Sequence, residues 1–259
     1  MTDPLPHLNK LIDTDQPFVT HLIELRNRLI KAGVAILVVT LLLGIYPGPA
    51  ALYELMAAPL VAHLPQGSTL IATSVISPFM VPLKVLLVAA FMLALPVVLY
   101  QAWAFVAPGL YAHEKKLVLP LVVSSTVLFL MGVAFCYFFV FGRVFAFIQS
   151  FAPASITATP DIEAYLDFVL SMFLAFGMAF EVPVVVMVLA RMDIFSIAKL
   201  KEFRGYFVVL AFIIAAIVTP DVISQLALAI PMCLLYEIGI WAAQVFIRHT
   251  QAPDKAAKT

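Results

Sequence analysis

The sequence predicts an all-α polytopic membrane protein with six transmembrane helices and both termini in the cytoplasm. Of its 259 residues, 64% are hydrophobic and 12% are charged, against about 45–50% and about 25% in a typical soluble domain. The apolar residues gather in runs long enough to cross a bilayer as helices, and the short alternating segments of a β-barrel are absent. Lys and Arg fall mainly on one side of these runs.

The apolar runs give the expected boundaries of the spans. The fourth run would rise roughly 43 Å as a helix, more than a hydrocarbon core of about 30 Å, so it must tilt or protrude. The fifth would rise only about 20 Å, so either the bilayer thins around it or its helix begins earlier, near Lys201. A short helix is also expected between Ala50 and Val61, in the first outer connection. The six predicted spans cover residues 29–46, 76–106, 117–148, 162–190, 206–218 and 222–247.

The positions of the basic residues predict the orientation. Thirteen of the 15 Lys and Arg residues lie on one side of the predicted spans; only Lys84 and Arg143 do not. Because basic loops stay in the cytoplasm, this pattern predicts an inner membrane protein with both ends inside. Lys84 is expected to extend its side chain outward to the membrane surface.

Prolines predict bent helices and hence a curved, glove-like wall. Pro96, Pro183 and Pro231 lie inside the second, fourth and sixth predicted spans, where each removes a helical hydrogen bond. No internal repeat or linker divides the chain. We expect one membrane domain over residues 1–259, with a cytoplasmic amphipathic segment (1–28), a six-span core (29–248) and a cytoplasmic tail (249–259).

The sequence offers no motif for enzymatic chemistry. Nucleotide-binding, serine-hydrolase and zinc-protease patterns are missing, so we expect no catalytic residue, no metal and no cofactor. Cys136 and Cys233 both lie in apolar runs and are expected to pack in the membrane. A net charge near zero gives no general attraction for nucleic acid. The N-terminus lacks the pattern of a cleaved signal peptide.

Two carboxylates are expected near the cytoplasmic surface. As a helix, residues 18–29 are amphipathic, and Glu24 can pair with Arg28 one turn later. Arg26 is either a membrane-surface anchor or part of a recognition surface. Glu114 either caps the third span and pairs with a neighbouring lysine, or joins Glu24 in binding two guanidinium groups.

Ionisable residues inside the spans are functional hypotheses by default. Glu181 lies near mid-membrane beside Pro183 and is expected to be a protonatable group on a bent helix. Glu237 either bonds a neighbouring Tyr or Trp or serves a function. Gln225 could hydrogen-bond a partner helix within the lipid.

Seven sequence blocks, taken in order, resemble the TatC family of twin-arginine protein translocase subunits. They are HLIELRNRL, APLVAHLPQGSTLIAT, SPFMVPLK, PVVLYQAWAFVAPGLYAHEKK, AFGMAFEVPV, TPDVISQLALAIP and YEIG. The resemblance implies a receptor subunit that binds twin-arginine signal peptides of folded cargo. It also implies assembly with single-span partners of the TatA and TatB type, self-association in a multimeric complex, and export driven by the proton-motive force.

The resemblance also assigns roles to residues. It implies a signal-peptide site at Glu24, Arg26, Phe105 and Glu114. It implies a partner-helix contact at Thr219, Asp221 and Gln225, and it matches Glu181 to the family's intramembrane glutamate. Many relatives have one more residue before the aspartate of the Thr219-Pro220-Asp221 turn, so the outer turn is expected to be tighter here.

A small-molecule or ion transporter is the alternative of a different class. It would use Glu181 and Glu237 as proton-coupled sites and Pro183 as a helix break. Such transporters commonly carry internal repeats, and the sequence shows none.

Overall fold

The described part of the protein is almost entirely helical and contains no β-strand. The computed structural model describes residues 6–61, 71–106, 118–151, 161–192, 194–219 and 221–255. Its elements are α1 (Pro6–Ile45), α2 (Pro49–Val61), α3 (Ser77–Val106), α4 (Val118–Phe135), the π-helical turn η3 (Cys136–Val140), α5 (Phe141–Phe151), α6 (Ile162–Ala179), α7 (Val182–Arg191), α8 (Ile197–Glu202), α9 (Arg204–Val218) and α10 (Val222–Lys255).

The long apolar helices confirm the multi-span architecture. Within the described residues, five segments are long and apolar enough to cross a membrane, and α9 is a sixth, shorter apolar helix. The five are Val19–Ile45, Ser77–Val106, Val118–Phe147, Ile162–Arg191 and Val222–Val245. The expected short helix is present as α2.

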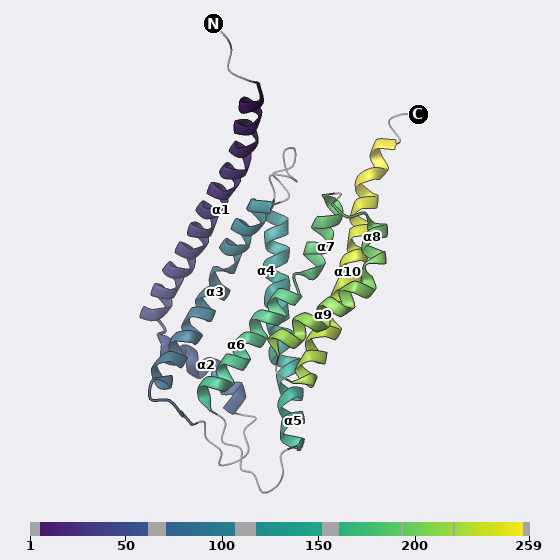
Figure 1. The fold of residues 1–259 in the computed structure, drawn as a ribbon. Helices are drawn as coiled ribbons and strands as arrows, with labels where there is room; N and C mark the ends of the chain where they lie inside the picture. Colours follow the sequence, from purple (N-terminus) through teal and green to yellow (C-terminus); the bar gives the residue numbers. More distant parts are fainter. Residues whose placement is uncertain are drawn as a thin grey trace.

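All the spans lie side by side between two ends of the molecule. In Figure 1, α1 begins and α10 ends at the same end, which we call the terminal end; α6 begins at the other, which we call the distal end. At the terminal end, α1 and α10 stand at opposite edges of the wall (Figure 1). Since α1 begins where α10 ends, the described helices cross the wall an even number of times, as six spans require.

The first helix differs from its prediction. An amphipathic segment was expected before the first span, and α1 joins that segment and the span in one unbroken helix of 40 residues. It packs mainly on α3. Its apolar side chains, such as Leu29 and Leu41, face outward, where lipid surrounds a membrane protein.

The fourth span is broken where the proline lies. Helix α6 ends at Ala179 and α7 starts at Val182, with Phe180 and Glu181 in the turn between them. Pro183 occupies the first turn of α7, where its missing N–H is tolerated. The predicted bend is therefore confirmed as a break, whereas α3 continues through Pro82 and Pro96.

The fifth and sixth spans begin and end beyond their predicted limits. A short helix, α8, precedes α9 and is capped by Ser196, so helix does start before Lys201, although Phe203 interrupts it. Helix α10 extends eight residues past the predicted end at 247, through most of the expected tail, to Lys255.

The main core lies where α6, α7, α9 and α10 meet. Its largest fully buried side chains include Phe176, Met172, Leu228 and Ile240. Close helix approach depends on glycine: a Cβ on Gly132 of α4 would clash with the Phe176 backbone, and one on Gly239 of α10 would meet the Pro183 Cα at 2.9 Å. Such small residues let membrane helices pack closely. As predicted, Cys136 is buried, and both cysteines are free thiols.

Candidate functional site

The polar face of α1 is turned toward the protein at the terminal end. The Glu24 carboxylate accepts hydrogen bonds from Nη2 and Nε of Arg28 at 2.6 and 2.9 Å, which confirms the predicted pairing. On the same face, the His21 ring stacks on Phe105 near the end of α3, with ring centroids 4.3 Å apart. The fold thus brings Glu24 and Phe105, two predicted site residues, to one face between α1 and α3.

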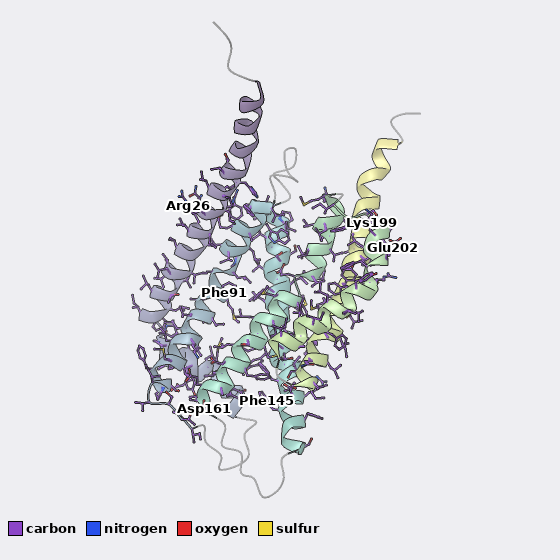
Figure 2. All side chains as sticks on the ribbon, in the orientation of Figure 1. Arg26, Phe91, Phe145, Asp161, Lys199 and Glu202 are labelled. Carbon is purple, nitrogen blue, oxygen red and sulfur yellow. The ribbon has the colours of Figure 1, made fainter. Side chains whose placement is uncertain are left out.

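Arg26 and Glu114 are not brought into this contact. Arg26 is exposed, and among the described residues it donates to its neighbour Asn27, at 3.3 Å. Figure 2 places Arg26 at the same end of the wall as Lys199 and Glu202, and far from Asp161. Glu114 lies outside the described residues, so its nearness to Glu24 stays a prediction.

Glu181 sits in the turn that breaks the fourth span. Both of its carboxylate oxygens are buried, and neither has a well-oriented hydrogen-bond partner among the described residues. The Ser125 hydroxyl of α4 lies close enough to interact with the carboxylate, and it accepts a hydrogen bond from Trp103 Nε1 at 2.9 Å. A carboxyl group held this way inside a membrane is costly when ionised, which fits the predicted protonatable group.

Glu237 has a different partner from the one predicted. A bond to a neighbouring Tyr or Trp was the alternative to a functional role, but Oε2 of Glu237 accepts from Arg204 Nη2 at 2.7 Å. This ion pair ties α10 to the start of α9, and both side chains are about half exposed. Tyr236 next to it donates instead to the Leu200 carbonyl.

The junction of α9 and α10 holds a small polar group at the distal end. The Asp221 carboxylate caps α10 by accepting from the Ser224 N–H at 2.8 Å. Thr219 is buried, and its hydroxyl donates to the Ala215 carbonyl. Gln225 donates to the Thr219 carbonyl at 3.4 Å, and the buried Ser224 hydroxyl has no partner among the described residues. Of these four polar residues, Thr219 and Ser224 are buried, and Asp221 and Gln225 are partly exposed and accessible to a partner.

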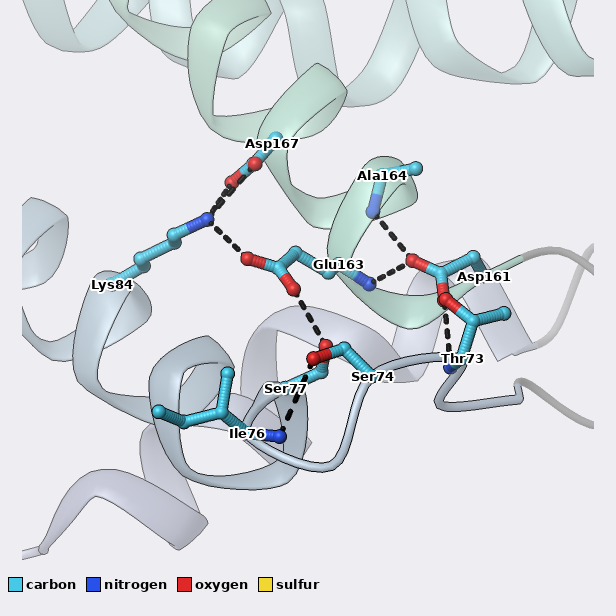
Figure 3. A network of polar contacts seen from close by, with 9 residues as sticks. All are labelled: Thr73, Ser74, Ile76, Ser77, Lys84, Asp161, Glu163, Ala164 and Asp167. Carbon is cyan, nitrogen blue, oxygen red and sulfur yellow. Dashed lines mark hydrogen bonds and ion pairs between the residues drawn. The ribbon is translucent and has the colours of Figure 1, made fainter.

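A larger distal network was not predicted. Asp161 caps α6 through the backbone N–H groups of Glu163 and Ala164, and its other oxygen accepts from both the N–H and the hydroxyl of Thr73 (Figure 3). These bonds, led by that from the Thr73 hydroxyl, lower the pKa of the Asp161 carboxyl to about 2. Asp161 therefore fastens the segment before α3 to the start of α6.

Lys84 belongs to the same network; its side chain was expected to extend outward to the membrane surface, and its two carboxylate partners on α6 were not predicted. Its ammonium group contacts Glu163 and Asp167 of α6, each at 2.9 Å, and Glu163 also accepts from the Ser77 hydroxyl (Figure 3). Glu163 and Asp167 are four residues apart on one helix face. Two carboxylates spaced four residues apart in one predicted span, together with a lysine in another, are the sequence signal from which this ion pairing could have been predicted.

Comparisons with known proteins agree with this architecture. The family described as "Sec-independent protein translocase protein (TatC)" matches residues 20–231. A protein of that name from Halothiobacillus neapolitanus is 50% identical over 89% of this chain, which spans 63% of that relative's length. The Escherichia coli K12 protein of that name is 46% identical over 91% of each chain.

Solved structures show the same fold. The crystal structure of a "Twin Arginine Translocase Receptor- TatC" superposes with a TM-score of 0.76 and 39% identity, over 87% of this chain and 98% of that one. The matched family is a component of protein transport and not an enzyme. The chain therefore belongs to the TatC family and is a multi-pass membrane protein of the Sec-independent translocase.

Proposed function

We propose that this protein is the receptor subunit that binds twin-arginine signal peptides at its terminal end. The observation that carries the proposal is the Glu24–Arg28 pair: the carboxylate already holds a guanidinium group at hydrogen-bond distance. Both of those bonds go to Oε1, which leaves Oε2 without a partner among the described residues. A guanidinium of the peptide can bind Oε2, or replace Arg28, by a charge-assisted bond.

The neighbouring side chains fit a peptide site. The stacked pair of His21 and Phe105 gives an aromatic surface beside the carboxylate, on which a guanidinium or an apolar side chain can lie. Arg26 is exposed at the same end. We place Glu114 in this site as the carboxylate for the second arginine, and the terminal end in the cytoplasm of a bacterium, with the spans in its inner membrane.

The junction of α9 and α10 is the proposed contact for TatA- and TatB-type single-span partners. Helix α9 has 15 residues and rises about 22 Å, which is short for a bilayer. A thinned bilayer there would favour a partner helix that meets the Gln225 amide and the Asp221 carboxylate. Thr219 supports this contact by holding Gln225. Export then draws on the proton-motive force, in a complex with several copies of the receptor.

Binding of signal peptides to the purified protein tests the proposal. A labelled twin-arginine peptide should bind at least about tenfold more tightly than its twin-lysine variant, because lysine cannot form the planar paired contact. Glu24→Gln should remove most of this difference. Glu54→Gln changes an exposed carboxylate on α2 and is the matched control, expected to bind as the wild type does.

A further variant tests whether Arg28 competes with the peptide for the Glu24 carboxylate. Arg28→Gln removes the internal guanidinium from Glu24, so the twin-arginine peptide should bind at least as tightly as before. Weaker binding would show that Arg28 itself contacts the peptide. Equal affinity for both peptides in the wild type, or unchanged affinity in Glu24→Gln, would contradict the signal-peptide site.

A further inference from the structure

An apolar groove of about 340 Å³ lies toward the distal end, away from the proposed peptide site and beside the first turns of α10. One wall comes from η3 and α5, with Phe139, Arg143 and Val144. The other comes from α10, with Leu226, Ala227 and Ile230. Arg143 is its one charged lining residue.

Arg143 is only partly satisfied by the protein. Its Nη1 donates to the Phe139 carbonyl at 2.8 Å, and its guanidinium carbon lies 5.9 Å from the centre of the Phe139 ring. A guanidinium has five N–H donors. Within the described part of the chain no carboxylate pairs with Arg143, whereas Lys84, the other basic residue away from the terminal end, has two.

The position of Arg143 along its helix suits a lipid headgroup. The apolar run of this span ends at Ile148, just before Gln149, five residues after Arg143 and about 7.5 Å further along the axis. The side chain of Arg143 is exposed and long enough to reach the membrane surface. Its charge therefore stands where the phosphate groups of the distal leaflet begin, and the groove runs beside it at the depth of the acyl chains.

We propose that this groove binds a phospholipid of the distal leaflet, with its phosphate diester on Arg143 and one acyl chain between η3–α5 and α10. The free N–H donors of a guanidinium match the paired oxygens of a phosphate.

Lipid titration followed by native mass spectrometry tests the proposal. The full-length protein is stripped of lipid in detergent and then titrated with phosphatidylglycerol or with a diacylglycerol of the same chains. The wild type should bind phosphatidylglycerol about tenfold more tightly than the diacylglycerol. Arg143→Gln should abolish this preference, and Arg143→Lys should keep part of it. Lys199→Gln, which removes an exposed cation at the terminal end, should change nothing.

A groove-filling variant and a competition with inorganic phosphate distinguish a bound phospholipid from other occupants of the groove. Ala227→Phe fills the groove and should weaken both lipids while leaving Arg143 in place. Inorganic phosphate at millimolar concentration should not displace the phospholipid, because the groove also holds its acyl chain. Equal binding of the two lipids by the wild type, or an unchanged preference in Arg143→Gln, would overturn the proposal. So would displacement by inorganic phosphate, or a photo-crosslinker at Ala227 that captures a single-span protein and no lipid.

Discussion

The two ends of the helix wall are held by different kinds of polar contact. At the distal end, the contacts join parts of the chain that are far apart in sequence: Thr73 and Asp161 are separated by 88 positions, and Lys84 and Glu163 by 79. At the terminal end, the ion pairs among the described residues join positions that are closer in sequence. Glu24 bonds Arg28 one turn away, and Arg204 bonds Glu237 of the adjacent helix, 33 positions on.

This difference between the two ends suits the proposed signal-peptide site at the terminal end. Long-range bonds at the distal end fix α3 and α6 relative to each other, so the wall keeps its shape there. At the terminal end, the partner of Glu24 among the described residues is Arg28 of its own helix, so exchanging this partner would break no ion pair between helices in the described part of the chain. A receptor gains from this arrangement, because the peptide can bind without unfolding the scaffold.

The largest expected effect at the distal end comes from Asp161→Ala. The change removes a helix cap and both bonds to Thr73, so the segment before α3 loses its attachment to α6. The melting temperature of the purified protein should fall by more than that of any other variant discussed here. Asp221→Ala is the matched control, because Asp221 caps α10 but its carboxylate binds no second segment among the described residues.

The pH dependence of stability tests whether the ionised Asp161 carboxylate is the group that stabilises the distal end. Since the folded pKa of Asp161 lies below its ordinary value of 3.8, the ionised carboxyl stabilises the fold above about pH 4. That contribution is lost as the pH falls toward 2, and Asp161→Ala should lack this part of the acid transition. Equal losses of melting temperature in Asp161→Ala and Asp221→Ala would show that the link to Thr73 contributes nothing.

The sequence predicted the parts of the structure that depend on local pattern. Apolar runs located the spans, Pro183 located the break, and the spacing of Glu24 and Arg28 gave their pair. The partners of Lys84 were missed because they lie 79 and 83 positions away, and no periodicity connects α3 to α6. The pairing of Arg204 with Glu237 was missed for the same reason: it depends on how α9 folds back on α10.

Removing the cation of the distal network should have a smaller effect. Lys84→Met leaves Glu163 and Asp167 beside each other without a positive charge. Because all three side chains are about one third to one half exposed, we expect a small loss of stability, seen as a fall of about 2–4 °C in melting temperature.

A mutant cycle separates the ion pairs from the packing of the lysine stem. The effect of Lys84→Met should largely vanish when Glu163→Gln and Asp167→Asn are already present. Lys199→Met, at an exposed position of α8, should leave the melting temperature unchanged. If Lys84→Met lowers the melting temperature as much when Glu163 and Asp167 are neutral, the lost stability comes from packing of the lysine stem. The ion pairs of Lys84 would then contribute nothing to the distal network.

The smallest effect is expected at the terminal end, from Arg204→Gln. Arg204 and Glu237 are 48% and 47% exposed, so water and salt screen their attraction, and the pair is worth about 0.5 kcal/mol or less. The variant and the wild type should melt within about 1–2 °C of each other at low salt and coincide at 1 M salt. A loss as large as that of Lys84→Met would mean that the ion pair between α9 and α10 holds this end as firmly as the distal network holds α3 and α6. Both ends of the helix wall would then be held equally firmly, and the proposed contrast between a rigid distal end and a more adaptable terminal end would be lost.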